Sequence, residues 1–361
     1  MNIYLLLSLA AFCVSFLIGM LATPMILNFC KEHNLYDEPG GRKVHNTQVP
    51  RLGGVSFIPS MFVAFFAMVC VLAYHGGETV EMSIWSINFF VGLMIIYLTG
   101  IIDDIAGLKP KTKFLAQIVA ASILPLSNLY YNNLYGLLGI HEIPFWVGAP
   151  LTVFVTVFIC NAMNLIDGID GLCAGLSLLS LSGFFLSFAH ENLWFYAILI
   201  AGLMGVLVSF LYFNLLGDVK KNRKIFMGDS GSLSLGFILA FLGVKYAMDN
   251  QYVMNFRHNG LLLGYTLLIV PCFDVVRVSL VRLMSHKPIF TADKNHIHHK
   301  LMRCGLSQRQ TLVVILLLSL SFTLLNTVLA HLHVYLSVIV LIDIVVWMAF
   351  HWLVNRKIST F

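Results

Sequence analysis

Charged residues are scarce in this sequence. Asp, Glu, Lys and Arg make up 11% of its 361 residues, hydrophobic residues make up 59%, and the mean hydropathy is +0.86. Soluble domains carry roughly 25% charged residues. The composition therefore excludes an ordinary soluble domain and predicts an integral membrane protein.

Other common features are also missing. The seven cysteines form no C-x-x-C pair and lie mostly within apolar runs, which is typical of small core residues and not of disulfides or metal ligands. No stretch rich in Pro, Ser or charge divides the chain, so we expect a single domain over residues 1–361. The first apolar run lacks the positive segment that precedes the apolar part of a signal peptide, and we expect it to be a retained span.

Long apolar runs, in contrast, are abundant. A helix needs about 20 apolar residues to cross a bilayer core of roughly 30 Å. Runs of about this length fall near 3–27, 55–74, 85–102, 114–131, 145–163, 172–189, 193–215, 232–248, 259–284, 312–330 and 333–354. The sequence predicts an all-α polytopic bundle of about 10 or 11 transmembrane helices.

The basic residues predict the orientation of this bundle. All Lys and Arg residues except Lys245 and Arg257 fall in connections that would lie on one side of the membrane. By the positive-inside rule this side is cytoplasmic. We therefore expect the N-terminus outside, the C-terminus in the cytoplasm, and an active site at the cytoplasmic face, because the acidic motifs described next lie on the same side.

The segment N-A-M-N-L-I-D-G-I-D-G-L, residues 161–172, ends one of the apolar runs. Polar groups spaced by three residues cannot share one face of a continuous helix. We therefore expect the helix to end near Gly168 and Gly171, with Asn164 on its last turns and with Asp167 and Asp170 on a turn that a ligand can approach. Ionisable groups at a membrane boundary are usually functional. The alternative is a polar helix end that is merely wetted by interfacial water.

Two further acidic motifs lie beside apolar runs. Asp103 and Asp104 follow one run, and their mutual repulsion calls for a positive neighbour, either lysines or a divalent cation. Asp229 lies in M-G-D-S-G-S before another run, where flanking glycines would let a phosphate or cation reach the backbone. The alternatives are a hydrated loop start for the first motif and an ordinary helix N-cap for the second.

Two basic segments complete the pattern. The later one, D-K-N-H-I-H-H-K at 293–300, lacks Cys or Glu at zinc-ligand spacing and fits a polyanion better, although a basic helix on anionic lipid is the alternative. The earlier one, R-K-V-H at 42–45 followed by P-R-L-G-G at 50–54, could be only a positive-inside anchor. Carboxylates suit Mg²⁺, and no G-x-x-x-x-G-K-[ST] loop for ATP is present. The motifs together indicate transfer between a soluble phosphorylated donor and a membrane-borne acceptor.

In their order and spacing these five motifs resemble the polyprenyl-phosphate N-acetylhexosamine-1-phosphate transferases, over nearly the whole chain. The resemblance implies a multi-pass enzyme of the bacterial inner (cytoplasmic) membrane. It implies transfer of a sugar 1-phosphate from a UDP-sugar to undecaprenyl phosphate, with release of UMP and with Mg²⁺, or Mn²⁺ in its place, as cofactor. No nucleic-acid partner is expected, and a homodimer is left open.

The resemblance also implies roles for particular residues. Asp229 would be the principal Mg²⁺ ligand, with Asp103 and Asp104 near the metal and the lipid phosphate. These three aspartates and His298 would be catalytic. The implied substrate-binding residues are Asn164, Asp167 and Asp170 at the nucleotide, Phe226 stacked on uracil, Lys113 at the phosphates, and Arg51, His45, His296, His299 and Arg303 in the basic segments.

The late loop bears on the choice of sugar. The branch that transfers phospho-MurNAc-pentapeptide carries three consecutive histidines, whereas Ile297 interrupts them here, which resembles the UDP-GlcNAc branch. GlcNAc-1-phosphate is therefore the expected group, in the first membrane step of cell-surface polysaccharide assembly. A secondary transporter is the alternative from another class, but transporters place acidic groups near the midplane, and here only Asp343 lies mid-span.

Overall fold

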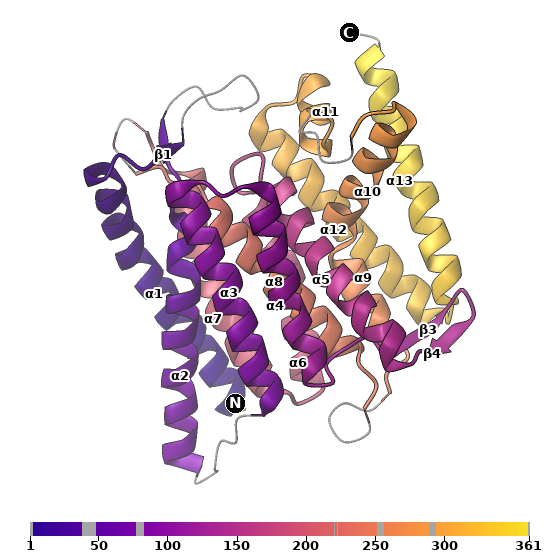
Figure 1. Cartoon of the computed structure of the whole chain (residues 1–361), viewed down its shortest axis with the longest axis horizontal. Helices are drawn as coiled ribbons and strands as arrows, with labels where there is room; N and C mark the ends of the chain where they lie inside the picture. The colour runs from indigo at the N-terminus through magenta and orange to yellow at the C-terminus, as the bar shows by residue number, and fades with distance from the viewer. Residues whose placement is uncertain are drawn as a thin grey trace.

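The computed structural model describes residues 3–37, 48–76, 83–219, 221, 223–250, 256–288 and 294–359. His45 lies outside these residues, as do Arg42, Lys43 and Asp293 of the two basic segments. Helices dominate the described part (Figure 1). They are α1 (Ile3–Glu32), α2 (Phe57–Gly76), α3 (Ile84–Ala106), α4 (Pro110–Leu126), α5 (Phe145–Ile166), α6 (Leu172–His190), α7 (Trp194–Leu215), α8 (Gly228–Ala247), α9 (Gly260–Leu267), α10 (Ile269–Met284), α11 (Ile297–Arg303), α12 (Gln308–His331) and α13 (Leu336–Ser359).

The predicted polytopic membrane protein is confirmed. Among the described residues, nine helices are long and apolar enough to cross a membrane, and α9 with α10 forms a further, bent candidate. Each of the eleven predicted runs coincides with a helix or with this bent pair. The exception in length is α4, whose 17 residues give a helix of about 26 Å at about 1.5 Å per residue. It ends at Leu126, earlier than predicted, because Asn128 adopts a left-handed conformation with φ 58°.

The break between α9 and α10 has a clear cause. The sequence predicted one continuous run over 259–284, but the two helices meet at an angle of 68°. Pro271 has no backbone N–H, so it cannot donate to the carbonyl of Leu267 one turn earlier. That carbonyl instead accepts a hydrogen bond of 2.7 Å from Ser180 Oγ in α6. A neighbouring helix thus satisfies the group that the proline leaves open, as the membrane interior requires.

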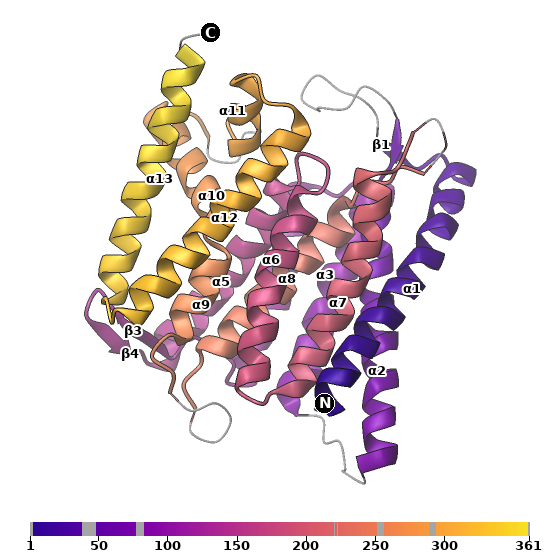
Figure 2. The same cartoon turned by 180° about the vertical axis from the view of Figure 1, so that it is seen from behind.

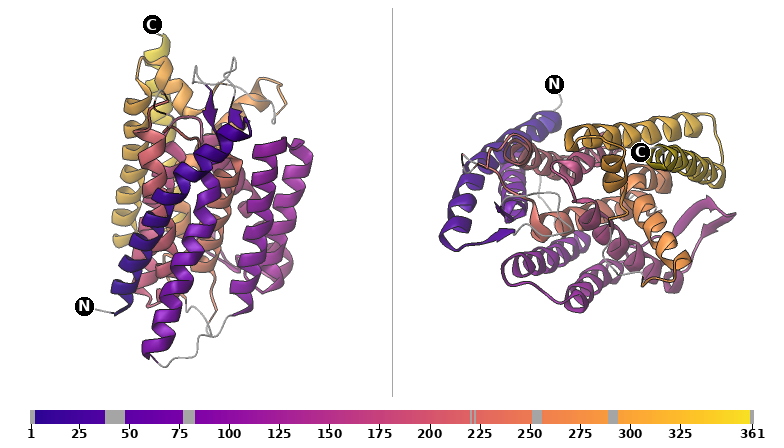
Figure 3. Two further views of the ribbon diagram at one scale, coloured as in Figure 1. Left: turned by 90° about the vertical axis from the view of Figure 1, so that its left-hand side faces the viewer. Right: turned by 90° about the horizontal axis from the view of Figure 1, so that it is seen from above.

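Helix α8 lies at the centre of the bundle. Every residue from Ser230 to Ala247 is buried, and the helix packs against α3, α5, α6 and α9. Its glycines allow this close packing, since a Cβ added at Gly236 would lie 2.6 Å from the Cα of Cys160 in α5. By contrast, only 28% of the apolar stretch is buried in each of α1, α12 and α13. These outer helices form the two flanks of the molecule (Figures 1 and 3).

Two short antiparallel hairpins lie at the ends of the helices. One pairs β1 (Tyr36–Asp37) with β2 (Val49–Pro50), which runs into the 3₁₀ helix η1 (Gly53–Ser56). The other pairs β3 (Asn133–Leu137) with β4 (Ile140–Glu142) at the opposite end of the bundle (Figure 2). The end that carries β1 and α11 also carries the chain's C-terminus, whereas the N-terminus lies at the other end (Figures 1 and 2).

Candidate active site

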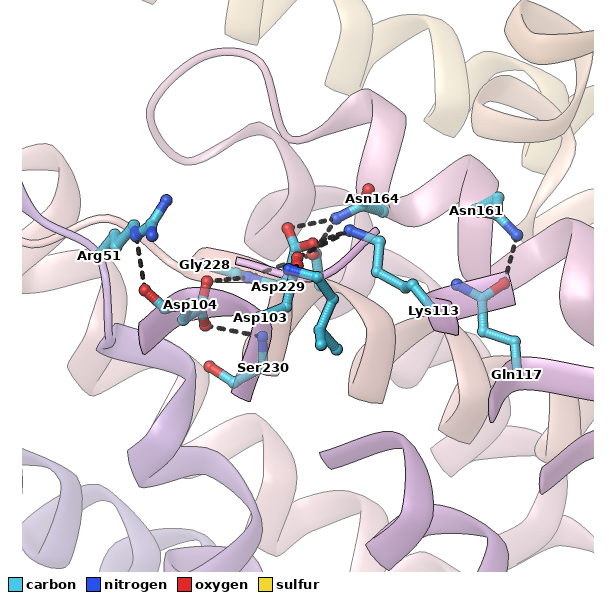
Figure 4. A network of polar contacts seen from close by, with 12 residues as sticks. Arg51, Asp103, Asp104, Lys113, Gln117, Asn161, Asn164, Gly228, Asp229 and Ser230 are labelled. Atoms are coloured by element: carbon cyan, nitrogen blue, oxygen red, sulfur yellow. Dashed lines mark hydrogen bonds and ion pairs between the residues drawn. The ribbon is translucent and has the colours of Figure 1, made fainter. Parts of the chain in front are cut away.

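The aspartate pair and the start of α8 meet at the end of the bundle that carries β1 and α11. Both carboxylate oxygens of Asp104, at the end of α3, accept backbone hydrogen bonds from the first turn of α8. Its Oδ1 accepts from Asp229 N at 2.8 Å and its Oδ2 from Ser230 N at 3.0 Å (Figure 4). Asp104 is only 4% exposed. It therefore caps α8 from a different helix, at the helix end where acidic groups are favoured.

Asp103 points instead toward Asp229. Lys113 Nζ, from the first turn of α4, donates to Asp103 Oδ2 at 3.0 Å and also contacts Asp229 Oδ2 (Figure 4). The backbone N–H of Leu108 donates to Asp103 Oδ1 at 2.6 Å. Asn164 Nδ2, on the last turns of α5, donates to Asp229 Oδ1 at 2.9 Å. One ammonium group thus joins two carboxylates that come from distant parts of the chain.

Lys113 is strongly held in its charged form. Burial lowers the pKa of Lys113, but the charges of Asp229 and Asp103 outweigh burial, so that its pKa is raised overall. The lysine occupies the position of a cation between two hard oxygen donors. Such a donor set fits Mg²⁺, which prefers carboxylate oxygens.

The turn between α5 and α6 has the predicted form. Helix α5 ends at Ile166 and α6 begins at Leu172, and Gly171 between them has φ +74°. Asp170 Oδ2 accepts from Lys224 Nζ at 2.5 Å. Partial burial raises the pKa of Asp167 to about 8, and the neighbouring charges of Asp229, Asp170 and Asp104 add to the rise. The prediction of aspartates on a glycine-loosened turn is confirmed.

His298 packs directly against this turn. A Cβ added at Gly168 would lie 2.2 Å from His298 Nε2, so the late histidine loop and the N-A-M-N-L-I-D-G motif meet in space. His298 is 1% exposed, and its Nδ1 has no hydrogen-bond partner among the described residues. Burial lowers the pKa of His298 to about 3, with a further contribution from His299. The imidazole is therefore neutral at neutral pH and can offer hydrogen bonds but no charge.

A buried carboxylate that the sequence analysis missed holds the histidine loop in place. Asp274 of α10 is fully buried. It accepts hydrogen bonds from Arg277 Nη2 at 2.7 Å and from Ile297 N at 3.0 Å, and His296 Nδ1 lies 2.8 Å from its second oxygen. The available signal was an acidic residue inside an apolar run, three residues before an arginine. This clamp engages His296, whose predicted role in substrate binding stays a prediction.

The remaining predicted residues lie at different depths. His299 is half-buried beside His298, with ring centroids 4.2 Å apart. Arg303 is exposed and donates to the carbonyl of Lys294 at 2.8 Å. Their roles as phosphate-binding groups stay predictions.

The P-R-L-G-G segment pairs with the residues just before α8. Phe226 N donates to Pro50 O at 2.7 Å, and Gly53 N donates to Phe226 O at 2.9 Å. Arg51 Nε donates to the backbone carbonyl of Asp104 at 2.8 Å. The segment therefore contacts the site, and Phe226 is half-buried at its edge.

Comparison with known proteins gives consistent matches. Residues 86–247 match the model of glycosyl transferase family 4. A probable undecaprenyl-phosphate N-acetylglucosaminyl 1-phosphate transferase of Bacillus subtilis is 33% identical, with 97% of this chain and 94% of the relative covered. Decaprenyl-phosphate N-acetylglucosaminephosphotransferase of Mycobacterium tuberculosis is 32% identical over 77% of this chain and 72% of its own. Phospho-N-acetylmuramoyl-pentapeptide-transferase of Listeria monocytogenes is 30% identical, with 83% of this chain and 91% of the relative covered.

Proposed function

This chain belongs to the polyprenyl-phosphate N-acetylhexosamine-1-phosphate transferases, and we propose from that premise that it transfers N-acetylglucosamine 1-phosphate from UDP-N-acetylglucosamine to a polyprenyl phosphate. UMP is the second product. The observation that carries the proposal is the pair of carboxylates, Asp103 and Asp229, joined by Lys113 beside the turn of Asp167 and Asp170. Anionic and cationic groups meet there at the end of a membrane bundle, where a lipid phosphate and a soluble nucleotide can meet as well.

Asp229 and Asp103 are the residues proposed to hold Mg²⁺, which Mn²⁺ would replace. Asp104 is already engaged as the cap of α8, so its contribution is to fix Asp229 in position. When bound, the cation supplies charge neutralisation for the donor pyrophosphate. Lys113 is then free to turn from the carboxylates toward a phosphate, which agrees with its predicted role.

Transfer proceeds in one displacement. An oxygen of the lipid phosphate attacks the phosphorus that bears the sugar, a new phosphoanhydride bond forms, and the bond to UMP breaks. A phosphate monoester with a pKa near 6 is already mostly dianionic at pH 7, so no general base is required. A covalent aspartyl intermediate is the alternative; we assign Asp103 and Asp229 to the cation instead.

His298 would donate one hydrogen bond to the pyrophosphate from its neutral ring. The Asp167 and Asp170 turn and Phe226 would hold the uridine. This arrangement would bring the nucleotide and the histidine loop together at Gly168, where His298 contacts the turn.

The site would face the cytoplasm in a bacterial inner membrane. Supporting this orientation, the described Lys and Arg residues other than Lys245 and Arg257 belong to connections or helix segments near the active-site end of the bundle. The positive-inside rule assigns such an end to the cytoplasm, where UDP-sugars are made available to the first step of surface polysaccharide assembly.

Purified protein tests the function directly. With UDP-N-acetylglucosamine, polyprenyl phosphate and Mg²⁺, we expect UMP and a lipid-linked diphosphate sugar in equal amounts, and no UMP when the lipid is omitted. A donor screen with other UDP-N-acetylhexosamines identifies the sugar. Absence of UMP with every donor would contradict the proposed function.

A further inference from the structure

Asp343 is a buried acid outside the proposed active site. It lies seven residues after Leu336, the first residue of α13, inside a membrane-spanning helix, and it is 0% exposed. It faces α9 and α12, which pack beside α13 on one flank of the molecule (Figures 1 and 2). A carboxylate in such surroundings is costly unless it is paired with a cation or neutralised.

The hydrogen bonds around Asp343 leave two atoms unexplained. Its Oδ2 accepts from Tyr265 Oη at 2.9 Å and from Asn326 Nδ2 at 3.0 Å. Asn326 Nδ2 also donates to Thr266 Oγ1 at 3.0 Å. The two remaining oxygens, Asp343 Oδ1 and Asn326 Oδ1, are buried and have no partner among the described residues. Both would be acceptors if Asp343 were ionised, so neither could satisfy the other.

We propose that Asp343 is protonated and that its Oδ1–H donates to Asn326 Oδ1. A carboxylic acid and a primary amide form a cyclic pair of two hydrogen bonds, N–H to O and O–H to O. The first of these bonds is present, and the two unpartnered oxygens are the ends that the second would join. One proton therefore satisfies both orphaned atoms at once.

The neighbouring groups agree with a neutral acid. Tyr265 is the titratable group that contacts Asp343, and Cys272 lies near Tyr265. None of the described Lys, Arg or His residues forms an ion pair with Asp343. Asp343, Asn326 and Tyr265 thus form an uncharged group, called the latch below, that joins α13 to α12 and α9.

The latch bears on the reaction because α13 also supports the histidine loop. Twelve residues further along α13, about 18 Å at about 1.5 Å per residue, Asn355 Oδ1 accepts from Lys300 Nζ at 2.8 Å. Next to it, the carbonyl of Val354 accepts from Cys304 Sγ at 3.6 Å. Lys300 belongs to α11, which carries His298. By fixing α13 along its axis, Asp343 acts as a positioning residue for α11.

Two substitutions separate the neutral latch from a charge. Asp343→Asn supplies an N–H₂ that donates to Asn326 Oδ1 and an oxygen that accepts from Tyr265 and Asn326. It should keep the wild-type melting temperature and a kcat within about twofold, which is about 0.4 kcal/mol. Asp343→Leu should lower both. Val345→Leu, on the lipid-facing side of the same helix, is the matched control and should change neither.

Two different results would contradict the proposal. If Asp343→Asn is as damaging as Asp343→Leu, the group must carry charge, and the proposal is wrong. If Asp343→Leu behaves as wild type, the latch has no role, and the proposal is also wrong. The kcat readout rests on the proposed transferase activity, whereas the melting temperature does not.

A spectroscopic measurement covers the case in which Asp343→Leu fails to fold. The infrared difference spectrum of wild type minus Asp343→Asn at neutral pH should contain the C=O stretch of a protonated carboxylic acid. A pair of carboxylate bands in its place would overturn the proposal. This result does not depend on the transferase activity.

Discussion

Asp229 holds the central position among the site residues. Its carboxylate contacts Lys113 and Asn164, and its backbone N–H is bound by Asp104. A substitution by Asn would keep an oxygen for Asn164 but remove the charge that Lys113 and a divalent cation require. The Asp229→Asn substitution therefore removes the charge of this side chain while keeping nearly the same volume.

We expect Asp229→Asn to lose at least about 100-fold in activity while remaining folded, because outer groups around metal ligands alone are worth 10–100-fold. The measurements are UMP release over a range of Mg²⁺ concentrations and the melting temperature. Asp343→Asn is the matched acid-to-amide control and should stay active. Near-normal activity of Asp229→Asn at limiting Mg²⁺ would remove Asp229 from the metal site.

His298 should show its buried state in the pH dependence of stability. Its pKa is lowered from 6.5 to about 3 by burial, so between these values the unfolded chain binds the proton and the folded chain does not. Stability is then lost as the pH falls from about 6.5 toward 3. His298→Gln cannot take up this proton, so its loss over that range should be shallower in chemical denaturation. Parallel curves for the two proteins would show that His298 titrates normally.

The same position should affect substrate binding more by hydrogen bonding than by charge. We expect His298→Ala to raise the KM for the UDP-sugar more than that for polyprenyl phosphate, and His298→Gln to retain part of the donor affinity. Arg303→Ala should also weaken the donor, but with a strong dependence on salt, because Arg303 is exposed. An effect of both alanine variants on the lipid KM alone would assign the loop to membrane docking.

At the scale of elements, the site depends on the close approach of η1 to the start of α8. A Cβ at Gly54 would lie 2.1 Å from the backbone nitrogen of Gly231, so no side chain fits without moving one backbone. Overpacking of this kind costs about 1–3 kcal/mol. We expect Gly54→Ala to lower the melting temperature and the activity together. Gly175→Ala is the control, since its Cβ would meet only the flexible side chain of Leu316 at 3.1 Å.

Several elements could be predicted from the sequence because the signals were local. The glycines at 168 and 171 indicated where α5 ends, and Ile166 is its last residue. Apolar runs located every long helix. In contrast, at the bend near Leu268 the hydroxyl of Ser180 in α6 donates a hydrogen bond to the carbonyl of Leu267. Because this partner lies on another helix, no local sequence pattern could predict it. The short strands β3 and β4 also lacked an apolar signal long enough to predict them.

The roles of the acidic residues were harder to predict for the same reason. Asp103 and Asp104 are neighbours in the sequence, yet one faces Lys113 and the other caps α8. The two side chains differ because consecutive residues of α3 point in different directions, and each direction leads to a different partner. The sequence could not assign roles to Asp274 and Asp343, because each also binds a partner from another helix, Ile297 at 23 residues from Asp274 and Asn326 at 17 residues from Asp343.

At the scale of the whole molecule, the orientation in the membrane is open to direct measurement. Lys111 is exposed at the active-site end, and Glu142 is exposed at the opposite end. We expect a membrane-impermeant thiol reagent to label Lys111→Cys only from the cytoplasmic side and Glu142→Cys only from the outer side, above the background of the wild-type protein. The reverse pattern would place the site outside and contradict the proposed use of a cytoplasmic UDP-sugar.

The central claim is a reversible, single displacement between two phosphoanhydrides. One such bond breaks and another forms, so the equilibrium constant should lie within roughly tenfold of unity, or about 1.4 kcal/mol. The most direct test incubates purified protein with Mg²⁺, UDP-N-acetylglucosamine and radiolabelled UMP. We predict that label enters the UDP-sugar only when polyprenyl phosphate is added. Exchange without lipid would require a covalent intermediate between the enzyme and the sugar phosphate. If no exchange occurred even in the presence of lipid, the transferase activity itself would be contradicted.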